Sequence, residues 1–206
     1  MTAPLQVSSL QSFLRSRRSI RRFKQDPVPM EVVERILETA TWAPSSHNRQ
    51  PWRFAVLLTQ GSRARIAEAM GADFERDLLA DGQAPEVVER TVARSRQRIV
   101  EAPLAILACL DPVAGDEYPD ARRQHAEHLM GVQSVALAGG LLLLAAHAEG
   151  LGGVWVCAPL FAPEAVRASL DLPDEWEPQG LLLLGYPARI PPQRARYPIG
   201  EVSRFY

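Results

Sequence analysis

The sequence predicts an α+β fold in a single domain that covers residues 1–206. Short apolar runs typical of strands are interspersed with helical periods, but strand and helix do not alternate strictly, as a parallel sheet would require. No segment repeats with a period of 20 to 50 residues. A glycine cluster at residues 150–153 follows a predicted helix and precedes a strand, the reverse of the dinucleotide-binding fingerprint, which argues against a Rossmann unit.

The N-terminal half contains mostly helical patterns. In order, it predicts helices at residues 7–16 and 31–40, a strand at 54–58, and charged helices at 62–70 and 85–100. Prolines before residue 30 interrupt the chain ahead of the second helix, and one face of this helix carries Val32, Val33, Ile36, Leu37 and Ala40. The pattern does not define the geometry of the variable region 71–100, which is expected to shape the choice of donor and acceptor.

The C-terminal half contains the strongest strand signals. In order, it predicts a strand at residues 103–110, a polar loop at 111–120, a long helix from about Ala121, a strand at 154–157, a short helix at 163–170 and a strand at 180–186. Gly150 to Gly153 end the long helix, and Pro163 suits the first turn of the short one. The tail after Pro187 is rich in proline and arginine.

Leu129–Ala148 is a run of twenty residues without a formal charge, long enough to span a bilayer as a helix. Glu149 follows at once, and Gln133, Ser134 and His147 lie within the run. We therefore favour a central helix that is covered on all sides, in part by a partner subunit. No membrane association is expected.

The charge and the cysteine content argue against several classes of function. The net charge is −1 and the pI about 6.4, so no broad basic field is present to recruit nucleic acid. Cys109 and Cys157 lie within apolar runs, which predicts buried thiols and no disulfide framework. The N-terminus lacks the pattern of a signal peptide, so we expect a cytoplasmic protein.

Metal and hydrolase sites are not predicted. His125 and His128 are three residues apart on a helix, but no third ligand follows at zinc spacing. A nucleophilic hydrolase of the strained-elbow type would need Gly-x-Ser-x-Gly, which does not occur.

Arg17, Arg18, Arg21 and Arg22 place four guanidinium groups within six residues. Arginine forks match phosphate oxygens in a bidentate way, and Ser19 adds a hydroxyl donor. The cluster indicates an anion site, with a solvated basic turn as the alternative.

A second polar cluster follows a helix later. Ser45, Ser46, Asn48 and Gln50 offer donors and acceptors suited to the edge of a heteroaromatic ring. Trp42 and Trp52 bracket the loop as apolar walls. An ordinary polar connection is the alternative interpretation.

Residues 15–54, the run Ala148–Gly152 and the triplet Gly185–Pro187 together resemble the flavin-dependent nitroreductase family. The resemblance implies a three-layer fold with a central, mainly antiparallel sheet, and FMN bound at the interface of an intertwined homodimer. It assigns FMN contacts to Arg17, Arg18, Ser19 and Arg21 of one subunit, and to Ser45, Ser46, Asn48 and Gln50 of the other. Arg194 and Arg196 resemble a basic pair that returns to the phosphate.

The segment Val156–Phe161 falls where this family covers the flavin ring and offers a backbone N–H to N5. Because Pro159 has no N–H, the donor is Ala158 or Leu160. Cys157 is then a packing residue. The resemblance implies that flavin N5 carries the chemistry, so no catalytic side chain is expected. The reaction would be a ping-pong hydride transfer from NADH, NADPH or reduced F420 to a small-molecule acceptor.

A narrower likeness concerns the acceptor. Residues 149–156 and 170–178 resemble the C-terminal FMN reductase domain of coenzyme F420 gamma-glutamyl ligases, although the ligase domain is lacking. The acceptor would be a conjugated or nitroaromatic compound, with the unsaturated precursor dehydro-F420-0 as one candidate. His47, Arg49 and Asp77 are the predicted substrate contacts, with polar surface residues that bind no ligand as the alternative. The alternative function is a non-catalytic protein that binds or stores a flavin or deazaflavin.

Overall fold

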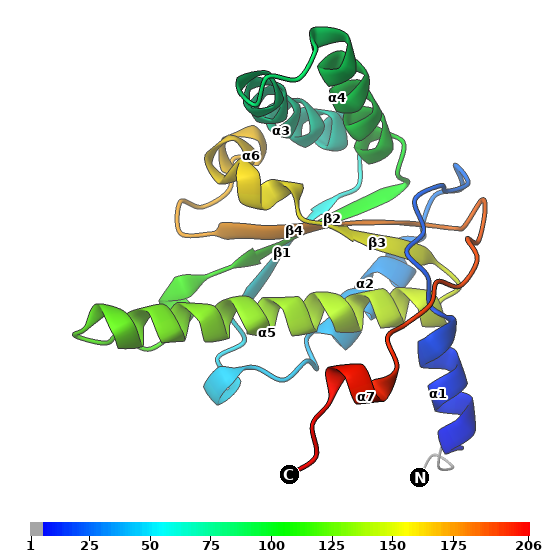
Figure 1. The fold of residues 1–206 in the computed structure, drawn as a ribbon, viewed down its shortest axis with the longest axis vertical. Helices are drawn as coiled ribbons and strands as arrows, with labels where there is room; N and C mark the ends of the chain where they lie inside the picture. The colour runs from blue at the N-terminus through cyan, green and yellow to red at the C-terminus, as the bar shows by residue number, and fades with distance from the viewer. Residues whose placement is uncertain (1–5) are drawn as a thin grey trace.

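The structure is a computed structural model that describes residues 6–206. Within them, four strands form one antiparallel sheet in the order β1-β2-β4-β3 (Figure 1). The strands are β1 (Trp52–Leu57), β2 (Leu104–Leu110), β3 (Gly152–Val156) and β4 (Glu177–Gly185). This confirms the predicted α+β class and the antiparallel sheet. Residues 1–5, on which the expectation of no signal peptide rests, lie outside the described part.

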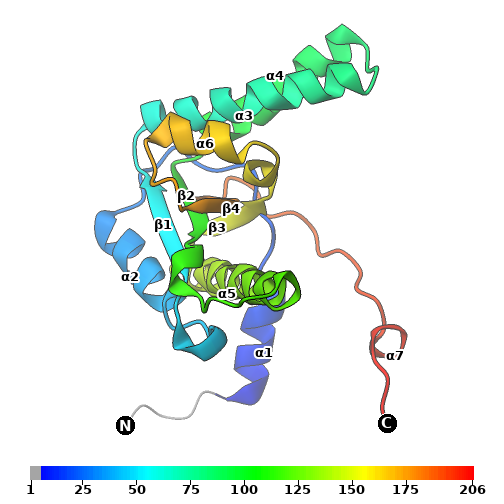
Figure 2. The ribbon, with the colours of Figure 1, turned by 90° about the vertical axis from the view of Figure 1, so that its left-hand side faces the viewer.

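Helices cover both faces of the sheet, which makes three layers (Figure 2). The helices are α1 (Val7–Ser16), α2 (Met30–Ala40), α3 (Gln60–Ala80), α4 (Pro85–Val100), α5 (Ala121–Ala148), α6 (Pro163–Leu170) and α7 (Ile199–Val202), with short 3-10 turns η1 (Ser46–Asn48), η2 (Pro112–Ala114) and η3 (Ala158–Phe161). Helices α2 and α5 lie on one face, and α3, α4 and α6 on the other.

Strand β2 shows how the sequence divides the core. Successive side chains of a strand point to opposite faces of the sheet. Leu104 and Ile106 therefore pack in the cluster beneath α2 and α5, whereas Ala105 and Leu107 pack with α3 and α6. Because both faces are covered, β2 is apolar at every position and fully buried, which explains why it lacks the alternation of a half-exposed strand.

Helix α5 is the long apolar helix expected from the sequence. Its inner side is in the core, since Val135, Ala138 and Leu142 are fully buried. Leu129 and Leu137 are about half exposed on other sides, so the single subunit does not cover this helix completely. By length and composition alone it would pass as a membrane span, but its packing on the sheet is that of a core helix.

Several local predictions were wrong. Helix α3 does not end near Met70 but runs on to Ala80, and with α4 it forms a helical hairpin in place of the undefined region. The second half of α3 is charged and largely exposed to solvent, and it is held by ion pairs such as that of Arg76 with Asp73. Because it buries no continuous apolar stripe, its sequence lacks the amphipathic pattern that predicts a helix. Trp42 is exposed and does not wall the loop, whereas Trp52 is buried.

Arg63 is a buried arginine that ties α3 to the sheet edge. Its Nη1 donates to the carbonyls of Leu57 (3.2 Å) and Leu58 (3.0 Å), and its Nε donates to that of Val100 (3.4 Å). Replacing Arg63 by methionine should lower the free energy of unfolding by about 1–3 kcal/mol, because these carbonyls lose their donor. Thermal unfolding should show a drop of about 2–10 °C.

The matched control is Arg65→Met on the same helix. Arg65 is exposed, and its nearest carboxylate, that of Asp171, is 3.8 Å away. Its replacement should change stability by no more than about 0.5 kcal/mol. Equal losses in the two variants would show that the carbonyl contacts of Arg63 are not the cause.

Candidate functional site

The predicted arginine cluster forms a basic cradle with the C-terminal tail. A cavity of about 170 Å³ is lined by Arg17, Arg18, Ser19, Arg21, Pro191, Pro192, Arg194 and Arg196. None of these five arginines forms an ion pair with a carboxylate among residues 6–206. Five cations without an acidic partner make a site for an anion with several oxygens, such as a phosphate.

Backbone contacts fix the cradle to the sheet. Ser19 forms a bridge with Gly153 of β3, and the Ile20 N–H donates to the Gly153 carbonyl at 3.0 Å. Close approach here requires glycine, since a Cβ on Gly152 would lie 2.5 Å from the Ile20 side chain. Arg18 is oriented by its own segment, donating to the carbonyls of Arg15 and Arg17.

Strand β3 connects the cradle to the predicted flavin-ring segment. From Gly153, beside Ser19, the chain reaches Ala158 after five residues, at most about 16 Å. The Leu160 N–H already donates to the Cys157 carbonyl at 3.0 Å, whereas the Ala158 N–H has no backbone acceptor within the described chain. Of the two donors that the sequence left open, Ala158 is the one that is available.

The second polar cluster lies elsewhere in the subunit. Its Ser46 N–H donates to Ser134 of α5 at 3.3 Å, whereas the cradle adjoins the end of α5, where Ser16 contacts His147 at 2.7 Å. Thirteen helical residues between these points correspond to about 20 Å. The structure therefore does not bring Ser45, Ser46, Asn48 and Gln50 into the cradle of the same chain.

The predicted substrate contacts are also divided. Asp77 is on α3 and borders an apolar cavity of about 360 Å³ whose lining includes Phe74, Ala158 and Phe161. His47 is in η1 and Arg49 follows it, and η1 lies against α5, where the Ser46 N–H donates to Ser134. Within one chain, Asp77 does not share a pocket with the other two.

The two cysteines differ, contrary to the prediction that both are buried. Cys109 is buried in β2, and burial raises the pKa of its thiol to about 12. Cys157 is exposed because β3 ends at Val156 and the chain turns into η3. Neither is in a disulfide.

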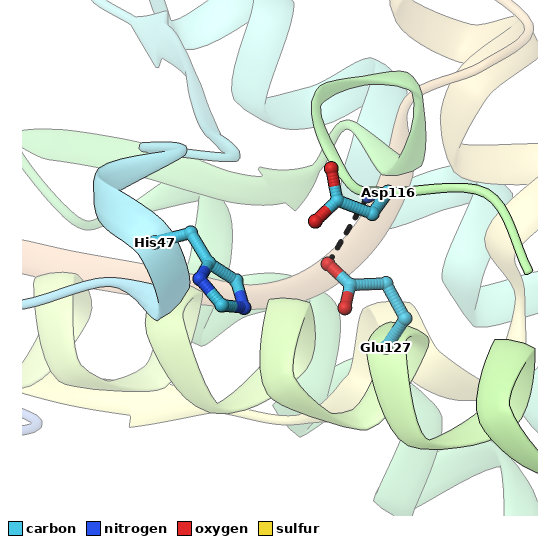
Figure 3. Close-up of side chains that lie close together, drawn as sticks. All are labelled: His47, Asp116 and Glu127. Carbon is cyan, nitrogen blue, oxygen red and sulfur yellow. Dashed lines mark hydrogen bonds between the residues drawn. The ribbon is translucent and has the colours of Figure 1, made fainter.

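One polar cluster was not predicted. His47, Asp116 and Glu127 lie together although they come from η1, the loop after η2 and α5 (Figure 3). Residue spacing gave no signal, because only the tertiary fold brings these segments together. The histidine pair considered from sequence is not a metal cluster in the described chain, since His125 is exposed and His128 contacts Glu177 at 2.7 Å.

His147 makes the junction beside the cradle sensitive to pH. Its ring stacks on Phe13 with centroids 4.9 Å apart, and burial, with Arg17 and Arg18 nearby, lowers its pKa below the ordinary 6.5. The folded state thus favours neutral imidazole, and its stability should fall as the pH drops below about 6.5, where the unfolded chain binds the proton more readily.

Unfolding curves at about pH 7.5 and 5.5 test this expectation. His147→Gln keeps a hydrogen-bonding group beside Ser16 but does not titrate, so its stability should depend less on pH than that of the wild type. His125→Gln, on an exposed part of the same helix, should behave like the wild type. An unchanged pH dependence in His147→Gln would contradict the assignment.

The fold and the cradle together define a class of protein. It is an α+β protein with a basic pocket, suited to a phosphate-like anion, at one end of the edge strand β3. Comparisons with known proteins identify the family. The model of the nitroreductase family matches residues 14–186, and the chain belongs to that family.

Relatives and solved structures are similar over nearly the whole chain. A protein from Rhodospirillum rubrum named 5,6-dimethylbenzimidazole synthase is 34% identical, with 95% of this chain and 87% of the relative covered. A protein from Thermus thermophilus named NADH dehydrogenase is 35% identical, with 98% of each chain covered. A solved structure from Desulfovibrio desulfuricans is described as a nitroreductase in complex with FMN. It is 27% identical, with a TM-score of 0.71, and the match covers 96% of each chain.

Proposed function

We propose that this protein is an FMN-dependent oxidoreductase that passes a hydride from NAD(P)H or another reduced donor to a conjugated or nitroaromatic acceptor. The observation that carries the proposal is the cradle of five arginines joined by β3 to the Ala158 segment, in a nitroreductase-family chain. The FMN complex of the Desulfovibrio relative supports the choice of cofactor.

The residues of the cradle fit an FMN phosphate. Arg17, Arg21 and Arg196 supply charge and donors, and the Ser19 hydroxyl adds another donor. When bound, FMN supplies hydride transfer through N5. The chain's own contribution is to hold the phosphate at one end of β3 and to present the Ala158 N–H at the other.

We propose further that the site is shared between two subunits of a homodimer. In one chain the loop with Ser46 and Asn48 is too far along α5 to join the cradle, so it would serve the cradle of the partner. Figure 2 shows the tail after Pro187 running away from the body to α7. Apolar side chains of this tail, including Ile190, Tyr197 and Ile199, are about 70% or more exposed, as expected for an arm that packs on a second copy.

The acceptor pocket in this proposal is the apolar cavity beside Ala158. Its aromatic walls, Phe74 and Phe161, suit a flat acceptor, and Asp77 lies at its border. His47 and Arg49 would approach from the partner with the rest of their loop. The charges of Asp77 and Arg49 would then select the polar substituents of the acceptor.

Two reactions are candidates for this protein, one with a named acceptor and one with a named product. The sequence likeness points to dehydro-F420-0, whereas the name of the Rhodospirillum relative points to formation of 5,6-dimethylbenzimidazole. A cytoplasmic location, without nucleic-acid or membrane partners, completes the proposal.

The test begins with the purified protein. It should be yellow or reconstitute with FMN, its ligand should be FMN by mass spectrometry, and its absorbance should bleach without oxygen on adding NADH, NADPH or reduced F420. An acceptor screen then follows reoxidation, with the products checked for reduced deazaflavin and for 5,6-dimethylbenzimidazole. Colourless protein that does not take up FMN would refute the proposal, and bound flavin that no acceptor reoxidises faster would favour storage.

A further inference from the structure

We propose that His47, Asp116 and Glu127 form a binding site for one divalent transition-metal cation. The imidazole and the two carboxylates each offer one ligand atom, and these atoms lie within 4.8 Å of one another. Figure 3 shows the three side chains pointing toward a common space from separate segments of the chain. A nitrogen and two oxygen donors suit first-row cations such as Mn²⁺ or Zn²⁺.

The buried carboxylate of Glu127 is the strongest sign of a missing ligand. Glu127 is only 6% exposed. Its Oε1 accepts the Asp116 N–H at 3.2 Å, but its Oε2 is buried and has no hydrogen-bond partner in the described chain. An unpaired buried carboxylate is costly, and a bound cation removes that cost by supplying the missing charge.

A small cavity adjoins Glu127, on the side of this residue that faces Ser134 and Ser46. It has a volume of about 50 Å³, room for one or two waters, and Glu127 is the one proposed ligand in its lining, so the cation itself would lie between the three ligand atoms.

Arg49 is the opposing charge in the cluster. It contacts Oδ1 of Asp116, which leaves the second oxygen of that carboxylate for a metal. Metal-ligating carboxylates are commonly held by such an outer contact. Two carboxylates against one guanidinium leave the cluster with one uncompensated negative charge when His47 is neutral.

Backbone strain at His47 is consistent with a ligand at this residue. His47 has a φ of 50°, in the left-handed region that non-glycine residues rarely adopt. A metal bond to its ring would hold η1 against α5 and the Asp116 loop. The metal would take no part in hydride transfer, but it would fix the turn that carries Ser46 and Asn48, and it would give His47 a role as a metal ligand in place of the acceptor contact proposed above.

Manganese binding to the purified protein tests the site. The chain, with its flavin, is treated with a chelator, dialysed and titrated with MnCl2 while free Mn²⁺ is followed by electron paramagnetic resonance. We expect one Mn²⁺ per chain, with affinity reduced at least about tenfold in Glu127→Gln and in His47→Gln. His47 is exposed, so the second variant serves if the first does not fold.

Matched controls remove a carboxyl group and an imidazole that lie near the cluster but are not proposed as metal ligands. Glu117→Gln and His125→Gln change an exposed carboxyl of the same loop and an exposed imidazole of α5, and both should bind like the wild type. Absence of stoichiometric Mn²⁺ binding to the wild-type protein would overturn the proposal. So would equal binding by wild type, Glu127→Gln and His47→Gln. Flavin content, measured on the same samples, reports separately on the proposed oxidoreductase.

Discussion

Replacing Arg17 and Arg21 together by alanine is expected to weaken FMN binding by about 10²–10⁴-fold. Each arginine would contribute a charge-assisted hydrogen bond to the phosphate, worth about 1.5–3 kcal/mol. Neither residue forms an ion pair in the described chain, so their removal should not unfold the subunit. Equilibrium titration of the flavin-free protein, followed by flavin fluorescence, measures the change.

Arg90→Ala with Arg94→Ala is the control for net charge. Both arginines are exposed on α4, away from the cradle, and their removal changes the charge of the chain by the same amount. FMN affinity should stay within a fewfold of wild type. If the α4 pair weakened binding as much as the cradle pair, a diffuse field would explain the affinity and the cradle assignment would be lost.

Alanine at Gly139 or Gly180 is expected to destabilise the subunit by about 1–3 kcal/mol each through overpacking. The Trp155 ring lies between these two glycines, one on α5 and one on β4. An added Cβ would come within 2.1 Å of the ring at Gly139 and within 2.2 Å at Gly180. Since Trp155 stands three residues before Ala158, a displaced ring should also weaken flavin binding.

Urea unfolding of both variants, with Gly61→Ala as the control, checks this expectation. Gly61 is in the first turn of α3, and an added Cβ there would meet only Thr59 at 3.9 Å. Its stability should be unchanged or slightly raised, because alanine favours helix more than glycine does. Wild-type stability in Gly139→Ala and Gly180→Ala would mean that Trp155 has room to move.

Much of the fold was predictable because local patterns and tertiary packing agree. Strand β2 and helix α5 have apolar runs whose length and flanking residues already distinguish strand from helix. The second half of α3 was missed because it is held by surface ion pairs and by α4, where Arg96 packs over Gly71, and not by a buried stripe.

The site was predictable only in part, for a similar reason. Arg17 and Arg21 are close in sequence, so their clustering was visible, and the likeness to the family linked them with Arg196. The cluster of His47, Asp116 and Glu127 depends on a tertiary contact between three segments, and the exposure of Cys157 depends on where β3 ends. Such properties arise from packing and carry no local sequence signal.

A heterodimer of two variants tests directly whether one subunit's cradle and the other subunit's loop form each flavin site. A chain with Arg17→Ala and Arg21→Ala is paired with a chain carrying Ser46→Ala and Asn48→Gly, and the doubly tagged heterodimer is purified. Glycine suits position 48, where φ is 53°. Each variant alone should lack FMN.

The FMN content of this heterodimer is the decisive measurement. In a shared arrangement one site receives both defects and the other site receives none, so we expect one FMN for each pair of chains. If cradle and loop of the same chain formed the site, both sites would be defective. A folded heterodimer without FMN would therefore contradict the shared site.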